Sequence, residues 1–206
     1  MPTLPPTPAY AGPAVASATA ELKNASGQVV GSAQFSQDAS GVVLIKASFS
    51  GVEGAHGMHI HTTGKCDAPD FTSAGGHFNP TGKKHGLLNP DGPHAGDLPE
   101  ITVLAGGAGS LETTTNRISL TAGASSLFDA DGSALVIHAG HDDQVTDPTG
   151  GSGARLACGV IVAAPSALPS TGGPPDDGNP WLLIAALAGA AMLVAGAAFA
   201  GLRRLS

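Results

Sequence analysis

The residues of this chain that could do chemistry are a set of histidines and one aspartate between positions 59 and 138. His59 and His61 are two residues apart in MHIH, a segment with strand composition. Alternate residues of a strand point to the same face, so both imidazoles can reach one ion. Further donors follow along the chain, namely His77, His85, His94, Asp97 and His138. Such a set suits Cu(II) in a tetragonal nitrogen field and Zn(II) in a tetrahedral one.

Short strands are expected to position these residues. Charged residues make up 12% of the chain, aromatic residues 4%, and glycines number 30, which favours strands joined by tight turns and an all-β fold. Strand-like segments bounded by Gly, Pro, Asp or Asn are predicted at 18–23, 29–35, 42–49, 58–61, 101–104, 117–120, 134–138 and 154–162. Thr62 to Pro93 and Ala139 to Ala154 interrupt them as long loops, and loops of such length are usually functional.

Charge and cysteine content restrict the partners and leave one question open. The formal net charge is -7 and no basic block is present, so nucleic acid is a poor candidate partner. The two cysteines, Cys66 and Cys158, could form a disulfide or remain two buried thiols, and the count alone does not decide between them.

The C-terminus predicts a membrane segment. Residues 181–202 are apolar and uncharged, long enough to cross a bilayer, and Arg203 and Arg204 follow at once. Basic residues at that end place the preceding chain outside the membrane, where disulfides persist. A core helix is the alternative, which the absence of a polar face disfavours. We therefore expect a transmembrane segment and basic tail at 181–206.

The remaining boundaries follow from composition. Residues 1–14 are rich in Pro and Ala, and Ala9-Tyr10-Ala11 has the small-x-small form of a cleavage site, so this segment is interpreted as a signal-peptide remnant or else a disordered tail. Residues 15–164 form the domain that carries the histidines. Residues 165–180 have too few apolar residues to pack and are predicted to be a linker.

The motifs resemble those of the copper/zinc superoxide dismutases, in particular their bacterial exported branch. The resemblance covers about Val15 to Val162, and it rests on G-M-H-I-H (57–61), S-A-G-G-H-F-N-P (73–80), K-H-G (84–86), H-A-G-D-L (94–98), V-I-H (136–138) and G-A-R-L-A-C-G-V-I (153–161). It implies an eight-stranded antiparallel Greek-key barrel or sandwich with two long functional loops.

The resemblance also implies a role for each metal-site residue. Copper would be held by His59, His61, His77 and His138, and zinc by His77, His85, His94 and Asp97, with His77 as a bridging imidazolate. Asp142 would link a copper histidine to a zinc histidine and fix the ring orientations. His56 matches a position of structural role, and His141 matches none.

An activity follows from the same resemblance. It implies disproportionation of superoxide to oxygen and hydrogen peroxide, with copper alternating between two oxidation states and His77 carrying a proton. Arg155 would dock the anion beside the copper, and Cys66 and Cys158 would form the disulfide that clamps the metal-binding loop. Loss of the open copper position would instead suit a metal-storage module, which is the alternative function. A homodimer is neither supported nor excluded by the sequence.

Leu168 to Gly172, L-P-S-T-G, resembles the L-P-x-T-G sorting signal of Gram-positive surface proteins. A polar spacer, an apolar span and a basic tail follow in the required order. The resemblance implies that sortase cuts between Thr171 and Gly172 and joins Thr171 to cell-wall peptide. The alternative is a linker before a permanent membrane anchor. Either way, the expected location is the outer face of the cell membrane or the wall.

Overall fold

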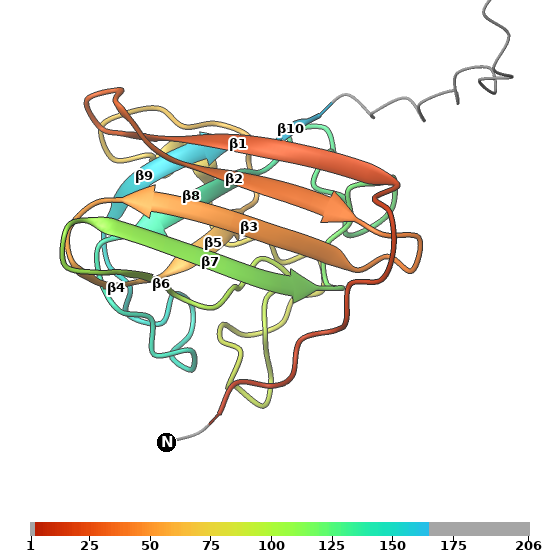
Figure 1. Ribbon diagram of the computed structural model, residues 1–206. Coiled ribbons are helices and arrows are strands. Elements are labelled where there is room, and N and C mark those ends of the chain that lie inside the picture. The colour runs from red at the N-terminus through yellow and green to blue at the C-terminus, as the bar shows by residue number, and fades with distance from the viewer. Residues whose placement is uncertain (1–2, 165–206) are drawn as a thin grey trace, which may run out of the picture. The chain divides into compact units, whose positions relative to one another are not determined.

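Ten antiparallel strands form the described part of the protein, residues 3–164 of a computed structural model (Figure 1). Their bounds are β1 (Ala16–Asn24), β2 (Val29–Gln37), β3 (Val43–Ser50), β4 (Gly54–His56), β5 (Met58–His61), β6 (Ile101–Val103), β7 (Ala108–Thr115), β8 (Ala134–His138), β9 (Arg155–Val160) and β10 (Val162–Ala163). One turn of 3-10 helix, η1 (Thr72–Ala74), is the single helical element within these residues. The all-β expectation is confirmed.

Alternation of side chains explains why these segments pair as strands. Along β3, Val43, Ile45, Ala47 and Phe49 are buried, whereas most residues between them face solvent. A strand with this pattern buries one face of the sheet and exposes the other. The inward residues of the strands join those of the loops in one hydrophobic core, which includes Leu22, Phe35, Ile45, Ile60, Leu98, Ile101, Leu135 and Ile137.

The strands form one sheet that curves into a nearly closed barrel. Its order is β4-β6-β7-β3-β2-β1-β9-β8-β5, with β10 added beside β1. The two end strands, β4 and β5, are consecutive in sequence and separated only by Gly57. A Cβ on Gly57 would come within 2.7 Å of Ser152 Cβ, so the residue at this break must be small. The sheet therefore starts and ends at the same point of the chain.

The structure has two more strands than the eight that the sequence predicts, because two strands change partner midway. β4 pairs with β6 and β5 pairs with β8, on either side of Gly57. In the same way β9 is followed, after Ile161, by β10, which pairs only with β1. If each interrupted pair is counted as one strand, the ten strands reduce to eight, the predicted number, although the eight are not all at the predicted positions.

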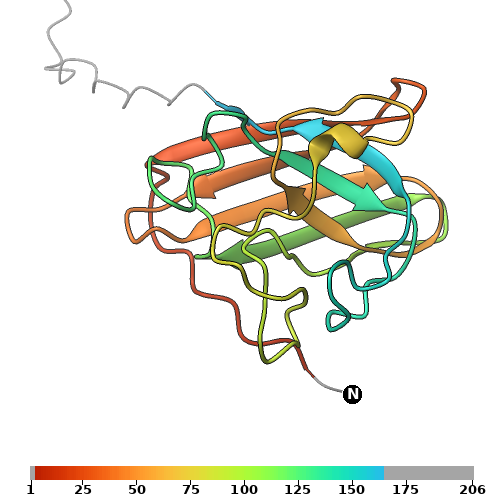
Figure 2. The ribbon, with the colours of Figure 1, turned by 180° about the vertical axis from the view of Figure 1, so that it is seen from behind.

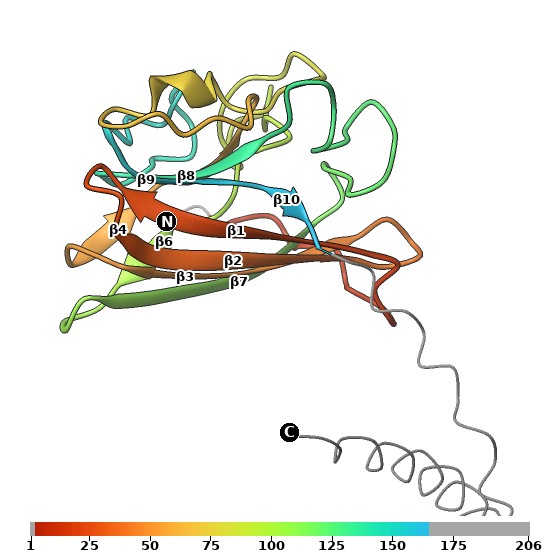
Figure 3. The same ribbon diagram turned by 90° about the horizontal axis from the view of Figure 1, so that it is seen from above.

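The strands lie in two layers, and the long loops cover one of them. Figure 3 shows β1, β2, β3 and β7 on one side and β8 and β9 on the other. Seen from behind, η1 and the loop between β5 and β6 lie over the β5, β8 and β9 layer (Figure 2). The loop between β8 and β9 lies at the same face. Both long loops predicted from the sequence are thus present, and the first extends beyond Pro93 to β6.

One predicted strand is wrong and one strand was missed. Residues 117–120 contain only an isolated bridge, Ser119 with Ser126, although Ile118 and Leu120 are buried. β7 was not predicted, because its buried positions near the end are threonines, Thr113 and Thr115. Buried threonines hide the apolar alternation that identifies a strand in a sequence.

The remaining expectations fall mostly outside the described residues. The sorting motif at 168–172 and the apolar segment at 181–202 both lie there. Among residues 3–164, no helix has the length and hydrophobicity needed to span a bilayer. The N-terminal residues 3–14 form no strand, but hydrogen bonds hold them against the barrel: the Ala11 N–H donates to Asp38 Oδ2 at 2.7 Å, and Thr114 Oγ1 donates to the Pro8 carbonyl.

Candidate metal centre

Three of the predicted copper residues belong to two neighbouring strands. His59 and His61 are on β5, and His138 ends β8, which pairs antiparallel with β5. His61 Nε2 and His138 Nε2 are 3.3 Å apart. Together with His77, these residues form a buried group whose donor atoms all lie within 4.8 Å of one another. The sheet itself thus fixes most of this set.

The predicted zinc residues come from the loop between β5 and β6, which is held against β5. Isolated bridges join His61 to His77 and His59 to Asp97. Asp97 Oδ1 lies 3.0 Å from both His77 Nδ1 and His85 Nδ1, and 3.4 Å from His94 Nδ1. His77 Nδ1 is 3.3 Å from the Nδ1 atoms of His85 and His94. The structure therefore brings all four residues together around one point.

Geometry alone also permits a four-residue group of His59, His77, His85 and Asp97, with His59 in place of His94. His59 has other partners, however: its Nε2 lies 2.6 Å from Asp142 Oδ2, and it also belongs to the group of His61 and His138. His94 Nδ1, by contrast, faces the other zinc candidates. We therefore prefer His94 as the fourth member.

Two buried nitrogens indicate where a metal ion would bind. His59 Nδ1 and His77 Nε2 are buried and have no hydrogen-bond partner among the described residues. A buried polar atom without a partner is costly, so such an atom is commonly explained by an ion or by function. Both atoms belong to the group that contains His61 and His138. The donor set consequently fits a metal ion bound by four imidazoles.

The surroundings keep the three strand-borne imidazoles of the copper group neutral. In the metal-free protein, burial lowers the pKa of His59 to about 4, that of His61 to about 2 and that of His138 to about 3. Backbone carbonyls fix two of these rings: His61 Nδ1 donates to Gly75 at 2.9 Å, and His138 Nδ1 donates to Gly153 at 3.0 Å. Their Nε2 atoms are then free to act as ligands, because metals bind neutral imidazole.

The zinc group is held by charge instead. Burial opposes ionisation of His85, but hydrogen bonds to Asp142 and Asp97 outweigh it and raise the pKa of His85 to about 9. Burial likewise opposes the charge on Asp97, yet hydrogen bonds from His77 and His85 hold the pKa of Asp97 far below its usual range. Burial also lowers the pKa of His94.

Asp142 connects the two groups. Its Oδ2 accepts a hydrogen bond from His59 Nε2 at 2.6 Å, and its Oδ1 accepts one from His85 Nε2 at 2.9 Å. Gly150, at φ +62°, lies so close that a Cβ there would collide with Asp142 Oδ1. Only glycine leaves room for the carboxylate and adopts this backbone conformation readily. This requirement was missed in the sequence, where the pair Gly150-Gly151 was its only signal.

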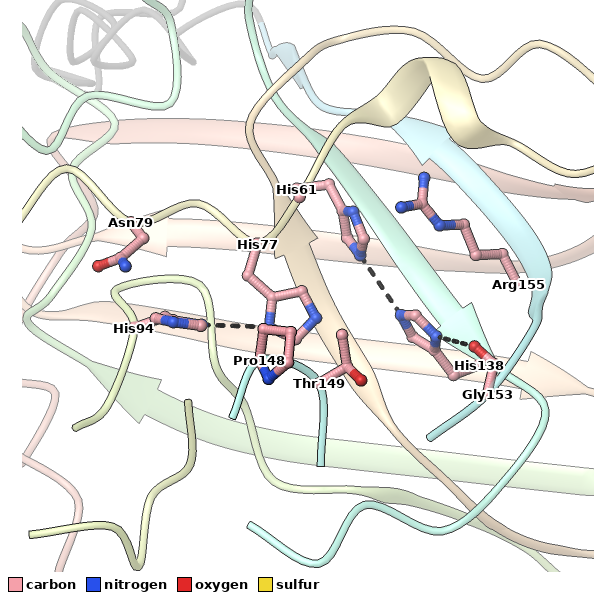
Figure 4. Close-up of a pocket in the computed structure, with 10 residues that line it drawn as sticks. His61, His77, Asn79, His94, His138, Pro148, Thr149, Gly153 and Arg155 are labelled. Atoms are coloured by element: carbon pink, nitrogen blue, oxygen red, sulfur yellow. Dashed lines mark hydrogen bonds between the residues drawn. The ribbon is translucent and has the colours of Figure 1, made fainter. Parts of the chain in front are cut away.

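A cavity of about 310 Å³ opens beside the copper group, and Arg155 lines it (Figure 4). Figure 4 shows His77 between His94 on one side and His61 and His138 on the other. Arg155 Nη2 donates to the Gly75 carbonyl at 2.6 Å, and Nη1 donates to the carbonyl of Phe71. The guanidinium is thus fixed at the wall of the cavity, where an anion could meet it.

A disulfide joins Cys66 to Cys158, with 5.6 Å between the Cα atoms. Cys158 is on β9 and Cys66 is in the loop that carries the zinc residues. Under the loop, Phe71 and Ala74 pack with Ala134, Val136 and Cys158 in a second small cluster. The question left open by the cysteine count is answered in favour of the disulfide, which anchors this loop to the sheet.

The two remaining histidines lie outside both groups. His56 contacts the carbonyls of Val52 and His138 at 2.7 and 2.9 Å and so links β4 to the end of β8. His141 is largely exposed and its Nδ1 lies 2.8 Å from Glu100. Sequence reasoning also missed Arg117, whose Nη2 donates to the Asp97 carbonyl at 2.7 Å. An arginine in a predicted strand gave no signal of that contact.

Fold and site define a class: an antiparallel β-barrel with a buried centre of histidines and carboxylates, suited to two metals, under a disulfide-anchored loop. The sequence profile of the copper/zinc superoxide dismutase (SODC) family matches residues 29–161. The protein belongs to this family.

Several relatives share most of the chain. A superoxide dismutase [Cu-Zn] of Aquifex aeolicus is 49% identical over 147 residues, which cover 70% of this chain and 85% of the relative. One of Caulobacter vibrioides is 45% identical over 149 residues, with the same shares, 70% and 85%. Among solved structures, a SOD-like protein from Bacillus subtilis is 39% identical, with a TM-score of 0.67, covering 70% of this chain and 97% of that one.

Proposed function

We propose that the protein disproportionates superoxide, converting two superoxide ions and two protons to oxygen and hydrogen peroxide. His59, His61, His77 and His138 hold copper, and His77, His85, His94 and Asp97 hold zinc. The observation that carries this proposal is the pair of buried nitrogens without partners among the described residues, His59 Nδ1 and His77 Nε2, in a buried group of four imidazoles beside a cavity with a fixed cation. Copper, when bound, supplies a one-electron redox couple.

The protein's own residues bind the superoxide anion and orient the metal-binding side chains. Arg155 attracts an anion by charge and offers it hydrogen bonds, as a fixed guanidinium does. His77 lines the cavity and has its Nδ1 held 3.0 Å from Asp97, so its Nε2 can hold a proton for peroxide formation whenever it is not bound to copper. Asp142 keeps His59 and His85 in one orientation each, because its two oxygens accept from both rings.

A metal titration paired with a turnover assay tests this function. Protein loaded with one equivalent each of copper and zinc should consume superoxide in pulse-radiolysis or stopped-flow measurements at a rate proportional to bound copper. Zinc alone should give no turnover. Stoichiometric binding of both metals without turnover would refute the proposal and establish the alternative, a metal-storage module. The fixed position of Arg155 favours the enzyme, since storage needs no anion-docking cation.

We also propose an exported location with C-terminal attachment. The disulfide supports export, because disulfides persist outside reducing compartments. The attachment rests on the sequence alone, through Leu168–Gly172 and the apolar residues 181–202. Wall digestion should release active enzyme ending at Thr171, and Thr171→Ala should move the protein to the membrane fraction. Wild-type protein that leaves cells only with detergent and retains Trp181 would contradict sorting and leave a membrane anchor.

A further inference from the structure

Arg117 contacts the main chain of one proposed zinc ligand, Asp97. Its Nη2 donates to the main-chain carbonyl of Asp97 at 2.7 Å, and its Nε is buried with no hydrogen-bond partner among the described residues. The backbone of Arg117 is fixed as well, since its N–H donates to Thr115 Oγ1 at the end of β7. The side chain therefore runs from the sheet to the back of one proposed zinc ligand.

Asp97 depends on its backbone position. Its Oδ2 accepts hydrogen bonds from the N–H groups of Gly86 and His94 at 2.8 and 2.9 Å, and its Oδ1 faces three histidines. Its neighbour Gly96 is held between the loop and β5, because its N–H donates to the Phe78 carbonyl and its own carbonyl accepts from the Ile60 N–H. Arg117 extends this hydrogen-bond network to the end of β7, because its side chain donates to the Asp97 carbonyl and its N–H donates to Thr115.

The N-terminal segment Leu4–Pro8 covers this arginine. Leu4–Pro8 line a small cavity of about 50 Å³ together with Leu87, Leu98, Pro99, Thr113, Thr114 and Arg117. The Thr114 hydroxyl donates to the Pro8 carbonyl, and Ala11 is tied to Asp38, so the segment is fastened at two points. Figure 1 shows it passing the end of β7.

The burial of Arg117 affects its pKa and the strength of its hydrogen bond to the Asp97 carbonyl. Burial lowers the pKa of Arg117, while the Asp97 carboxylate nearby acts in the opposite direction. Arg117 is half-buried, so less solvent competes for the guanidinium than at the surface, and its hydrogen bond to the Asp97 carbonyl becomes stronger. Partners of this kind behind a metal ligand commonly contribute about 10- to 100-fold in metal affinity.

We propose that Arg117 is a positioning residue for the zinc ligand Asp97 and that Leu4–Pro8 is the segment that shields it. This inference rests on the proposed zinc group. The inference also requires that residues 4–8 remain in the mature protein, whereas cleavage after Ala11 would remove them. The role is one of orientation, because the Arg117 guanidinium donates to the main-chain carbonyl of Asp97, whereas the carboxylate of Asp97 is the proposed metal-binding group.

The test is the zinc affinity of full-length, copper-free protein, measured by competition with a chromophoric chelator. Arg117→Met should weaken zinc binding about 10-fold or more, whereas Arg117→Lys, which keeps a donor, should recover most of the loss. The visible spectrum of the cobalt-substituted protein should change in Arg117→Met. Unchanged or tighter zinc binding in Arg117→Met, with the wild type binding normally, would overturn the inference.

Two further variants keep the proposal testable if Arg117→Met fails to fold. Deletion of residues 1–8 and the substitution Thr114→Val leave Arg117 in place but open its cover, and each should weaken zinc binding about two- to threefold. Thr102→Val, at an exposed position on β6, is the matched control and should change nothing. Equal zinc affinity in both variants and wild type would remove the shielding role. Failure of the wild type to bind zinc would instead refute the zinc group itself.

Discussion

The two halves of the metal centre are built in different ways. The proposed copper half takes three of its four residues, His59, His61 and His138, from β5 and β8, whereas the proposed zinc half takes all of its residues from one long loop. In the strands, burial keeps the imidazoles neutral, with pKa values lowered to between about 2 and 4. In the loop, carboxylates hold the residues together and raise the pKa of His85 to about 9. A rigid sheet can thus preform a neutral site, but a loop needs charges to order it.

The largest expected effect comes from removing one strand-borne ligand. His138→Ala should reduce superoxide turnover to background while zinc stays bound, because His138 belongs to the copper group alone. His94→Ala is the reciprocal variant and should lose zinc while copper is retained. Metal content by mass spectrometry, beside the turnover rate, checks both. Equal loss of both metals in either variant would show that the halves are not independent.

The next largest effect is expected from removing the disulfide, which joins the loop half to the sheet half. Removing a native disulfide commonly costs about 2 to 5 kcal/mol. Replacing Cys66 and Cys158 by serine should therefore lower the free energy of unfolding by that order, and zinc should be lost more readily than copper because the loop carries the zinc residues. Denaturant unfolding and chelator challenge measure the two effects. Unfolding at the same denaturant concentration in both proteins would mean that the cluster around Phe71 and Ala74 holds the loop unaided.

Arg155→Ala should have a smaller effect, confined to substrate capture. We expect the second-order rate to fall about 10- to 100-fold, with a weaker dependence on ionic strength, because a steering charge is lost. Arg155→Lys should keep part of the rate. Lys84→Ala is the control: it also removes a cation, but an exposed one paired with Asp91, and should leave the rate within twofold. A rate unchanged in Arg155→Ala, with metal content intact, would refute the docking role.

The smallest expected effect is the number of protons released when zinc binds. In the metal-free protein His85 is protonated at pH 7, because its pKa is raised to about 9, and zinc must displace that proton. Zinc binding should release about one proton at pH 7, falling towards zero above pH 10, whereas copper added alone should release almost none. Calorimetry in buffers of different ionisation enthalpy measures this release. Equal release by both metals would remove the electrostatic contrast between the two halves.

The raised pKa of His85 also makes the stability of the metal-free fold depend on pH. A pKa of His85 raised above its unfolded value of about 6.5 stabilises the metal-free fold fully below that pH. This contribution is lost as the pH rises through about 9. Metal-free protein should therefore unfold more easily at pH 10 than at pH 7 by this contribution, and His85→Asn should weaken that difference.

The sequence predicted the strands with clear alternation and all residues of the two groups, because histidine spacing and motifs are local features. It did not predict β7, whose buried threonines resemble surface residues, and it placed a strand at 117–120, where burial is not accompanied by pairing. The contact of Arg117 with the Asp97 carbonyl and the packing of Leu4–Pro8 join residues about 20 and 100 positions apart. No local pattern encodes such contacts.

The position of β9 in the sheet sets the order in which the chain can fold. β9 pairs with both β1 and β8, so segments near the two ends of the described chain meet, with Lys23 opposite Cys158. Contacts between residues so far apart in sequence slow folding, because a long loop must close before they form. A chain that emerges from its N-terminus cannot close the barrel, or join Cys66 to Cys158, until residues 155–160 have appeared.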